Sequence, residues 1–303
     1  MKFFASNQTT PVAARPERRR GFSVVEVVVV VGLMSFIVLG LVMMFSQTQR
    51  AYKLGTSQVD VLEGGRATID MIGRELAVIT PSRISGTENF YADLPFAGPI
   101  TQILPGLPAV TRTNAIYDLY FLSKENQTWS GIGYHIGNRQ AGVGTLYRYQ
   151  MSARAPISPQ LMFQNFFYYA DNRITTNRNE PLDNQLDLNI SRLIDGVVHF
   201  RVRAYDTTGS WITNTVGITP TNSIWLDYST LIPGEMRYRA MYSNLVPATV
   251  ELELGVLEDA VLAKARAIPD LTARTNYLAQ QVSRVHLFRL RVPVRNVDPT
   301  AFQ

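Results

Sequence analysis

The chain has 303 residues, of which 46% are apolar, and it contains no cysteine. This length fits one or two domains, and the apolar fraction is that of a globular protein, which excludes a protein with many membrane spans. The lack of cysteine excludes disulfides, thiolate metal sites and cysteine nucleophiles. The net charge is +5, but residues 1–21 hold five basic residues against one acidic residue, so the rest of the chain is nearly neutral. We therefore expect no nucleic-acid partner.

Residues 22–45 form an apolar segment whose one charged residue is Glu26. About 20 apolar residues span a bilayer, and such a segment must be helical because lipid offers its backbone no hydrogen bonds. Its 16 Val, Ile, Leu and Phe residues favour insertion by about 5–10 kcal/mol, whereas a carboxylate at the helix centre costs about 2.5–3.5 kcal/mol. Four arginines precede the segment, so the positive-inside rule predicts a cytoplasmic N-terminus and an external head.

The junction before this segment has a basic leader ending in glycine, then an aromatic residue, and reads Arg18-Arg19-Arg20-Gly21-Phe22-Ser23-Val24-Val25-Glu26. It resembles the type III signal of type IV pilins and type II secretion pseudopilins, in which a glutamate stands at the fifth mature position. The resemblance implies that prepilin peptidase cleaves between Gly21 and Phe22 and that Phe22 is then N-methylated. The leader, residues 1–21, is longer than those of many major pilins, which argues against a major pilin.

The resemblance also implies a role for Glu26 in subunit assembly. In this family its partner is the freed amino terminus, commonly of the neighbouring subunit, and the ion pair sets the axial register of the helices. A buried carboxylate without a partner is costly, which is why an ionisable residue inside a membrane usually has a function. The alternative is that Glu26 only reaches to the lipid headgroups.

Two other signals fit parts of this region. Arg19-Arg20-Gly21-Phe22 matches the core of a twin-arginine export signal, but such signals have a shorter apolar core and a cleavage site after it. A plain signal anchor explains the helix and the arginines, but it does not explain a carboxylate four residues after Phe22.

Residues 46–80 are expected to continue the helix as a stalk. Val59, Leu62, Ile69, Ile72 and Leu76 recur at helical spacing, and we expect this stripe to pack on the head. Gly64-Gly65 is a soft point at which the helix is expected to bend or open.

Residues 81–303 form the predicted head, which is rich in short alternating runs. The strand candidates are Ile116–Leu122, Gly131–Ile136, Leu146–Met151, Val197–Tyr205, Thr249–Val256 and Val285–Val294. Helices are predicted over Glu258–Ala267 and Leu271–Arg284, and loops over 81–113, 171–192 and most of 206–246. Together with the resemblance, this predicts an α+β, pilin-like fold in which a long N-terminal helix packs on an antiparallel β-sheet head.

Segments of the predicted head resemble particular minor subunits within this family. The run LIDGVVHFRVRAYDTTGSW, the strands LVPATVELELGV and VHLFRLRVPVRN, and GTLYRYQMS before them are similar to the J-type minor pseudopilin and the PilW minor pilins. Glu26 argues against the topmost subunit of the tip complex, because the K-type tip subunit characteristically lacks this glutamate.

Other chemistry in the head is sparse. His135, His199 and His286 lie on separate strand candidates without the spacing of metal ligands, so we expect ordinary histidines of a sheet.

Asp171, Asp183 and Asp187 stand among Asn residues and offer oxygen ligands for calcium, but without EF-hand spacing a solvated loop is expected. The aromatic residues 166–169, beside Arg173 and Arg178, are the kind that stack on single-stranded DNA, but a strand or core edge is favoured. No P-loop, GxSxG or HExxH pattern occurs.

The sequence therefore predicts a minor pilin or pseudopilin: a structural subunit, not an enzyme, that needs no cofactor or metal and helps to prime filament assembly. The resemblance implies three partners, which are other pilin or pseudopilin subunits, prepilin peptidase and the inner-membrane assembly platform. It places the chain in the bacterial inner membrane as a single-pass protein with a periplasmic head, and then in a pilus or pseudopilus. The alternatives are an adhesive or DNA-binding minor pilin and, from another class, a membrane-tethered periplasmic enzyme.

Overall fold

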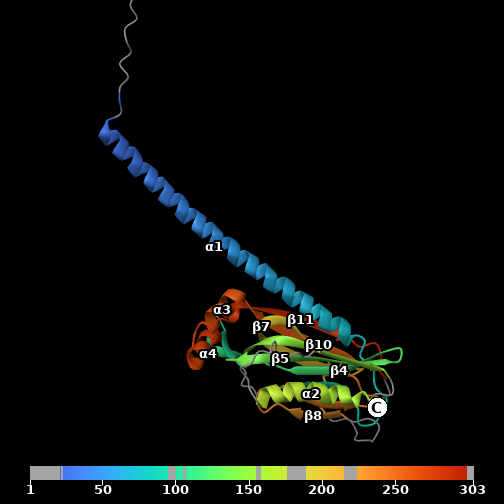
Figure 1. The fold of residues 1–303 in the computed structure, drawn as a ribbon. Coiled ribbons are helices and arrows are strands. Elements are labelled where there is room, and N and C mark those ends of the chain that lie inside the picture. Colours follow the sequence, from blue (N-terminus) through green and yellow to red (C-terminus); the bar gives the residue numbers. More distant parts are fainter. Residues whose placement is uncertain are drawn as a thin grey trace, which may run out of the picture. The chain divides into compact units, whose positions relative to one another are not determined.

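The computed structural model describes residues 21, 23–94, 100–104, 107–154, 158–175, 189–214 and 224–298. Within this part, the expected α+β architecture is confirmed, with a long N-terminal helix and a large antiparallel sheet (Figure 1). The chain divides into two compact units, residues 1–53 and residues 54–303. Helix α1 (Val24–Leu76) begins in the first unit and ends in the second.

In the first unit, the described side chains from Val24 to Lys53 are all exposed. Among the helices of the described part of the chain, α1 is the one long and apolar enough to cross a membrane. In the first unit, the hydroxyl groups of Ser35, Ser46 and Thr48 bond to carbonyl groups of the helix itself. Ser35 Oγ donates to the Val31 carbonyl at 2.8 Å, and Thr48 Oγ1 donates to the Met44 carbonyl at 2.9 Å. Such internal bonds remove the cost of a hydroxyl in lipid.

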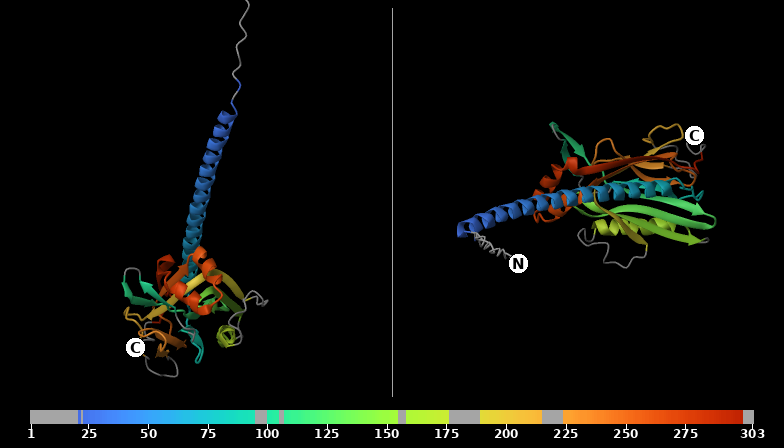
Figure 2. Two further views of the ribbon diagram at one scale, coloured as in Figure 1. Left: turned by 90° about the vertical axis from the view of Figure 1, so that its left-hand side faces the viewer. Right: turned by 90° about the horizontal axis from the view of Figure 1, so that it is seen from above.

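In the second unit, residues 54–76 of α1 pack along one face of the sheet (Figure 2). The buried positions are Val61, Gly65, Thr68, Ile69, Ile72, Gly73 and Leu76. The predicted stripe is thus correct for its last three members. It is wrong for Val59 and Leu62, which are 58% and 45% exposed, because the face that meets the sheet runs through Val61, Gly65 and Thr68 instead.

The expected local opening of the helix at Gly64-Gly65 is also wrong, since α1 is continuous through both residues. A Cβ atom on Gly65 would overlap the ring of Phe288, so glycine here lets the helix approach the sheet closely. The helix ends at Leu76 and not at Thr80. A residue before proline is restricted to extended backbone, and Thr80, which precedes Pro81, donates its N–H to the Leu122 carbonyl at 3.0 Å.

Nine strands form one antiparallel sheet in the order β11-β10-β7-β6-β5-β4-β1-β9-β8. Their bounds are β1 Glu88–Asp93, β4 Asp118–Glu125, β5 Thr128–Gln140, β6 Val143–Arg154, β7 Ile190–Tyr205, β8 Ile224–Tyr228, β9 Met236–Tyr242, β10 Thr249–Leu257 and β11 Val285–Pro293. A separate hairpin pairs β2 (Thr101–Leu104) with β3 (Leu107–Thr113). All six predicted strands are present as β4, β5, β6, β7, β10 and β11.

The two faces of the sheet are covered by different helices. On β4, Leu119 and Phe121 join the core beneath α1, whereas Tyr120 and Leu122 face helix α2 (Gln160–Thr175). Figure 1 shows α2 on the opposite side of the sheet from residues 54–76 of α1. The predicted C-terminal helices are present as α3 (Asp259–Arg266) and α4 (Leu271–Ala279), and a single 3-10 turn, Val282–Arg284, follows α4.

The predicted loops are wrong in three places. The 81–113 tract contains β1, β2 and β3, and the 206–246 tract contains β8 and β9. Helix α2 was not expected, and its last residues replace the start of the predicted 171–192 loop. Strand β7 begins at Ile190, so the end of that tract is also regular. Residues 176–188 lie outside the described part of the chain.

Strand β7 separates from β6 along its second half. Its first half pairs with β6 from Ile190 to Val197. Beyond this point Phe200 bonds to the segment before β4, with its N–H donating to the Ala115 carbonyl at 2.7 Å, and Tyr205 forms a bridge with Trp211. The charged network described below lies beside this opening.

Candidate functional site

The predicted processing and assembly residues lie at the start of α1. Gly21 is exposed and precedes the helix, while residues 1–20 and Phe22 lie outside the described residues. Glu26 lies in the first helical turn and is exposed. A negative charge at this end of a helix is favourable because of the positive end of the helix dipole.

Ser23 and Glu26 hydrogen-bond to each other's backbone. The Glu26 N–H donates to Ser23 Oγ at 3.2 Å, and the Ser23 N–H donates to Glu26 Oε2 at 3.4 Å. This reciprocal pair is a capping box, which satisfies two backbone donors that the first helical turn leaves open. The signal is visible in the sequence as Ser-x-x-Glu, and it gives Glu26 a role within its own helix.

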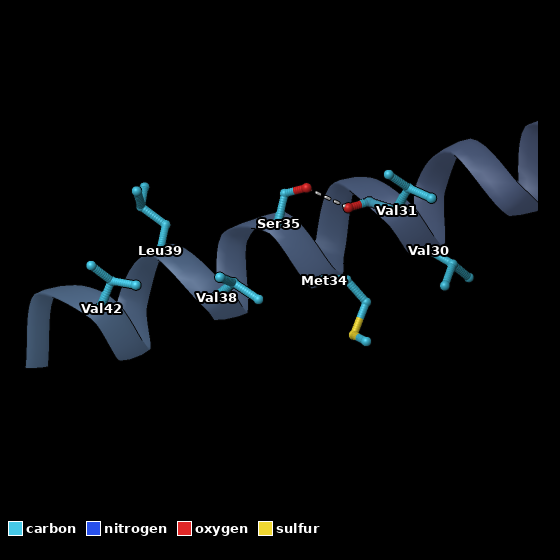
Figure 3. A pocket seen from close by; sticks show the side chains of 7 residues that line it. All are labelled: Val30, Val31, Met34, Ser35, Val38, Leu39 and Val42. Atoms are coloured by element: carbon cyan, nitrogen blue, oxygen red, sulfur yellow. Dashed lines mark hydrogen bonds between the residues drawn. The ribbon is translucent and has the colours of Figure 1, made fainter. Parts of the chain in front are cut away.

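The apolar first half of α1 carries a shallow groove. It is formed by side chains of the helix itself, and Figure 3 shows its lining of Val30, Val31, Met34, Ser35, Val38, Leu39 and Val42. All seven side chains are exposed. In the first unit, therefore, no described residue covers this surface.

In the second unit, the last turn of α1 is fixed to the sheet by a charged clamp. Arg148 on β6 donates from Nη2 to Glu75 Oε1 at 2.6 Å, and from Nε to Oε1 at 3.0 Å and to Oε2 at 3.3 Å. The hydroxyl of Tyr134 on β5 donates to the other oxygen, Glu75 Oε2. Bidentate arginine–carboxylate pairs of this kind are strong and directional. No local sequence pattern indicates this clamp, because its members lie far apart along the chain.

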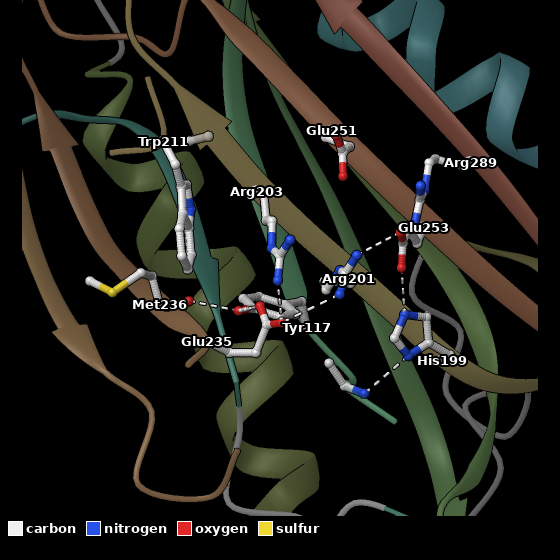
Figure 4. A network of polar contacts seen from close by, with 12 residues as sticks. Tyr117, His199, Arg201, Arg203, Trp211, Glu235, Met236, Glu251, Glu253 and Arg289 are labelled. Atoms are coloured by element: carbon white, nitrogen blue, oxygen red, sulfur yellow. Dashed lines mark hydrogen bonds and ion pairs between the residues drawn. The ribbon is translucent and has the colours of Figure 1, made fainter. Parts of the chain in front are cut away.

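On the sheet face opposite α1, Glu253 is the centre of a charged network (Figure 4). Arg201 Nη2 lies 2.6 Å from Glu253 Oε1, Arg289 pairs with the same oxygen, and His199 Nε2 lies 3.3 Å from Oε2. Burial alone would raise the pKa of the Glu253 carboxyl, but the hydrogen bond from His199 and the charges of Arg201 and Arg289 lower it to about 2. Glu253 is thus held as a buried carboxylate.

Glu235 is the second anion of this network. Arg203 Nη2 lies 2.8 Å and Arg201 Nη1 3.5 Å from Glu235 Oε1. The Tyr117 hydroxyl donates to the Met236 carbonyl at 2.7 Å and lies 3.3 Å from Glu235 Oε2. Burial of Tyr117, together with the charge of Glu235, raises the pKa of this phenol far above its ordinary value. These contacts join the start of β9 to β7 through Glu235, and to the segment before β4 through Tyr117.

The three histidines lie on three strands, as the sequence predicted, and each faces a carboxylate. His135 Nδ1 lies 3.0 Å from Asp118 Oδ1, and His286 Nε2 lies 3.3 Å from Glu258 Oε1. The Ala115 N–H donates to His199 Nδ1 at 3.1 Å, so the neutral ring with its proton on Nε2 fits both neighbours, and burial lowers the pKa of His199. Among the described residues, no group of three or more His, Asp or Glu side chains could hold a metal ion.

The two remaining candidate sites lie at the edge of the described structure. Asp183, Asp187 and Arg178 fall outside the described residues, and nothing is described of the side chains of Asp171 and Arg173. The predicted aromatic cluster lies on helix α2 and not on a strand. Phe166 is buried and stacks on Tyr120, with ring centroids 5.3 Å apart, so it packs in the core and is not free to stack on a nucleic-acid base.

Comparisons of the chain with protein-family models, with curated proteins and with solved structures found no match.

Proposed function

We propose that this chain is a minor pilin or pseudopilin, a non-enzymatic structural subunit of a type IV pilus or type II secretion pseudopilus. Prepilin peptidase would cleave after Gly21 and methylate Phe22, and the subunit would then join the filament through its apolar helix. The chain would sit in the bacterial inner membrane as a single-pass protein with a periplasmic head, beside other subunits and the assembly platform.

One observation carries this proposal. The Gly21-Phe22 junction stands immediately before a helix that begins at Val24 and has a carboxylate in its first turn. A signal anchor explains the apolar helix and the arginines, but it does not require a carboxylate four residues after Phe22. A filament subunit uses this charge to set the register of its neighbours.

Three features of the fold support the proposal. The membrane-spanning surface of α1 is exposed throughout, including its apolar groove, and lateral association of such helices would cover it. Residues 54–76 of the same helix form part of the head core, so a pull on the helix would be transmitted to the folded head. The Glu75–Arg148 pair and the Tyr134 hydroxyl strengthen this connection.

Glu26 has two possible functions, and its contacts suggest how to separate them. As a register partner, Glu26 must be charged, whereas as a member of the capping box it needs only an acceptor oxygen at the end of a side chain of this length. Glu26→Gln keeps the acceptor and removes the charge. Ser23→Ala removes the other half of the box and keeps the charge.

The test compares Glu26→Ala, Glu26→Gln and Ser23→Ala in cells that contain the assembly machinery. We expect all three proteins to reach the membrane at wild-type abundance and to be processed. Filament number and crosslinking between subunits should fall sharply for Glu26→Gln as well as Glu26→Ala, whereas Ser23→Ala should remain near wild type because losing a cap costs only about 1 kcal/mol.

The opposite ranking, with Glu26→Gln normal and Ser23→Ala impaired, would show that Glu26 acts only as a helix cap. If the alanine variant assembles filaments at the wild-type frequency, Glu26 has no assembly role, and the ion-pair mechanism is wrong for this chain. Gel mobility of precursor and mature forms provides the control that processing is unchanged in every variant.

A further inference from the structure

The two edges of the large sheet differ in a way that points to a binding site. At one edge, β8 has five residues and a bulge between Trp225 and Leu226. At the other edge, β11 has nine residues and pairs with β10 in unbroken register from Val285 to Pro293. Short, bulged edges resist further pairing, whereas a long regular edge offers a row of free N–H and C=O groups to another strand. Within the described residues, no strand pairs with the outer side of β11.

The side chains near this edge follow a repeating charge pattern. On the face opposite α1, Glu251 stands in register between Arg203 of β7 and Arg291 of β11. Two residues further along β10, Glu253 stands between Arg201 and Arg289 in the same way. The sheet thus carries two parallel Arg–Glu–Arg rows, which end at the free edge in two arginines.

These two arginines are open to solvent, whereas the carboxylate beneath them is not. The Arg289 side chain is 62% exposed, whereas that of Glu253 is 3% exposed. Arg291 is also exposed, and its guanidinium lies over the ring of Tyr205, 4.3 Å from the ring centre. If another strand paired with β11, its residues opposite Arg289 and Arg291 would extend the two rows. Acidic side chains at these positions would continue the alternation of positive and negative charge.

The other face of β11, which is turned toward α1, is apolar. Phe288 and Leu290 point toward α1, where they lie against Gly65 and Gly73, and both are only half-buried. A strand added beside β11 would place its alternate side chains next to these two residues. Because side chains alternate between the faces of a strand, the matching segment has acidic residues at every second position and apolar residues between them.

We propose that the free edge of β11 binds an extended segment of a partner protein in which acidic and apolar residues alternate. The chain contains an example of this pattern in β10, Val250-Glu251-Leu252-Glu253-Leu254, which already fits between two arginine-bearing strands. A second copy of β11 is a poor occupant. Antiparallel pairing centred on Leu290 would place Arg289 opposite Arg291 twice, and like charges in opposing positions are destabilising. The edge belongs to the head, so this proposal does not depend on whether α1 enters a filament.

The probe for the test is a labelled peptide with the β10 sequence Thr-Val-Glu-Leu-Glu-Leu-Gly-Val, added to the full-length protein in detergent micelles. We expect saturable binding by fluorescence anisotropy. Two control peptides separate the contribution of charge from that of backbone pairing. In the first, both glutamates are replaced by lysine. The second is N-methylated at alternate residues, so that it cannot pair with a strand edge. Neither should bind, and equal binding of either one would overturn the proposal, as would a failure of the glutamate peptide to bind.

The protein variants test the location. Arg289→Glu together with Arg291→Glu should weaken binding of the glutamate peptide about tenfold, since two attractive cross-strand pairs become repulsive. Arg291→Glu alone leaves the Arg289–Glu253 pair intact and should weaken binding in the same direction by a smaller factor. The doubly substituted protein should now bind the lysine peptide, a gain that a misfolded head could not show. Lys124→Glu with Arg154→Glu, two exposed cations on β4 and β6, should leave the affinity unchanged. Loss of affinity in this control, or no gain of lysine-peptide binding, would contradict a site on β11.

Discussion

The ring of Phe288 on β11 occupies the space that a Cβ atom on Gly65 of α1 would need. The neighbouring Gly64 differs, because a Cβ there would meet only Ile194 Cδ1 at 3.5 Å, which is an ordinary contact. Two adjacent glycines in one helix thus have different surroundings, and Gly65, like Gly73 beside Leu290, lies where helix and sheet approach closely.

Substitution of these two glycines by alanine should therefore have opposite effects. Gly64→Ala gains helix propensity without a clash and is expected to stabilise the head by about 0.5–1 kcal/mol. Gly65→Ala must displace the Phe288 ring and is expected to destabilise it by about 1–3 kcal/mol. Urea unfolding of a soluble fragment, residues 47–303, measures both. A stabilising Gly65→Ala would mean that the ring moves aside freely and that the close contact has no energetic value.

The fragment 47–303 should itself fold as a monomer. Residues 54–76 of α1 contribute Ile69, Ile72 and Leu76 to the core of the second unit, and no disulfide is required. Circular dichroism should show mixed helix and strand and a cooperative thermal transition. A matched fragment that begins at residue 81 lacks the helix and should be unfolded or aggregated. If both fragments fold equally well, the helix is not part of the head core.

The head should lose stability in acid through Glu253. The pKa of this carboxyl is about 2 in the folded protein, below its ordinary value of 4.5, so its ionised form stabilises the fold above pH 4.5. That contribution should disappear as the pH falls from about 4.5 to about 2. Glu253→Gln should lower stability at pH 7 by about 1–3 kcal/mol and should flatten the acid slope in this window. Glu251→Gln on the same strand is the control, and an unchanged slope in Glu253→Gln would assign the acid loss to other groups.

The helices and strands of this fold can be predicted where the sequence has one clear hydrophobic pattern. The apolar run predicts the first half of α1, and β7 and β10 alternate apolar and charged residues because one face is core and the other carries the Arg–Glu rows. Strand β1 was missed because all six of its residues are buried, so it has no alternation. Its Asn89 is buried through side-chain bonds to the Ser243 and Leu245 carbonyls, which only the folded chain brings together.

Helix α2 was missed for a different reason. Its aromatic residues have high strand propensity, but Met162, Phe163 and Phe166 lie at helical spacing and pack on Tyr120, Tyr91 and Tyr149 of the sheet. Tertiary packing thus overrides local preference. In the candidate site, Gly21, Phe22 and Glu26 belong to one local sequence motif, so they could be proposed from the sequence alone. The Ser23–Glu26 capping box could also have been predicted, from its Ser-x-x-Glu spacing. The Glu75–Arg148 clamp depends on contacts between distant segments, and no local pattern predicts it.

The most direct test of the central claim is the intact mass of the chain purified from membranes of cells that contain prepilin peptidase. We predict a mature protein that begins at Phe22 and carries one N-terminal methyl group, and we predict that Gly21→Val accumulates as the uncleaved precursor. A mature N-terminus at any other residue, an unmethylated Phe22, or normal cleavage of the Gly21→Val variant would contradict the assignment of this chain to the prepilin class.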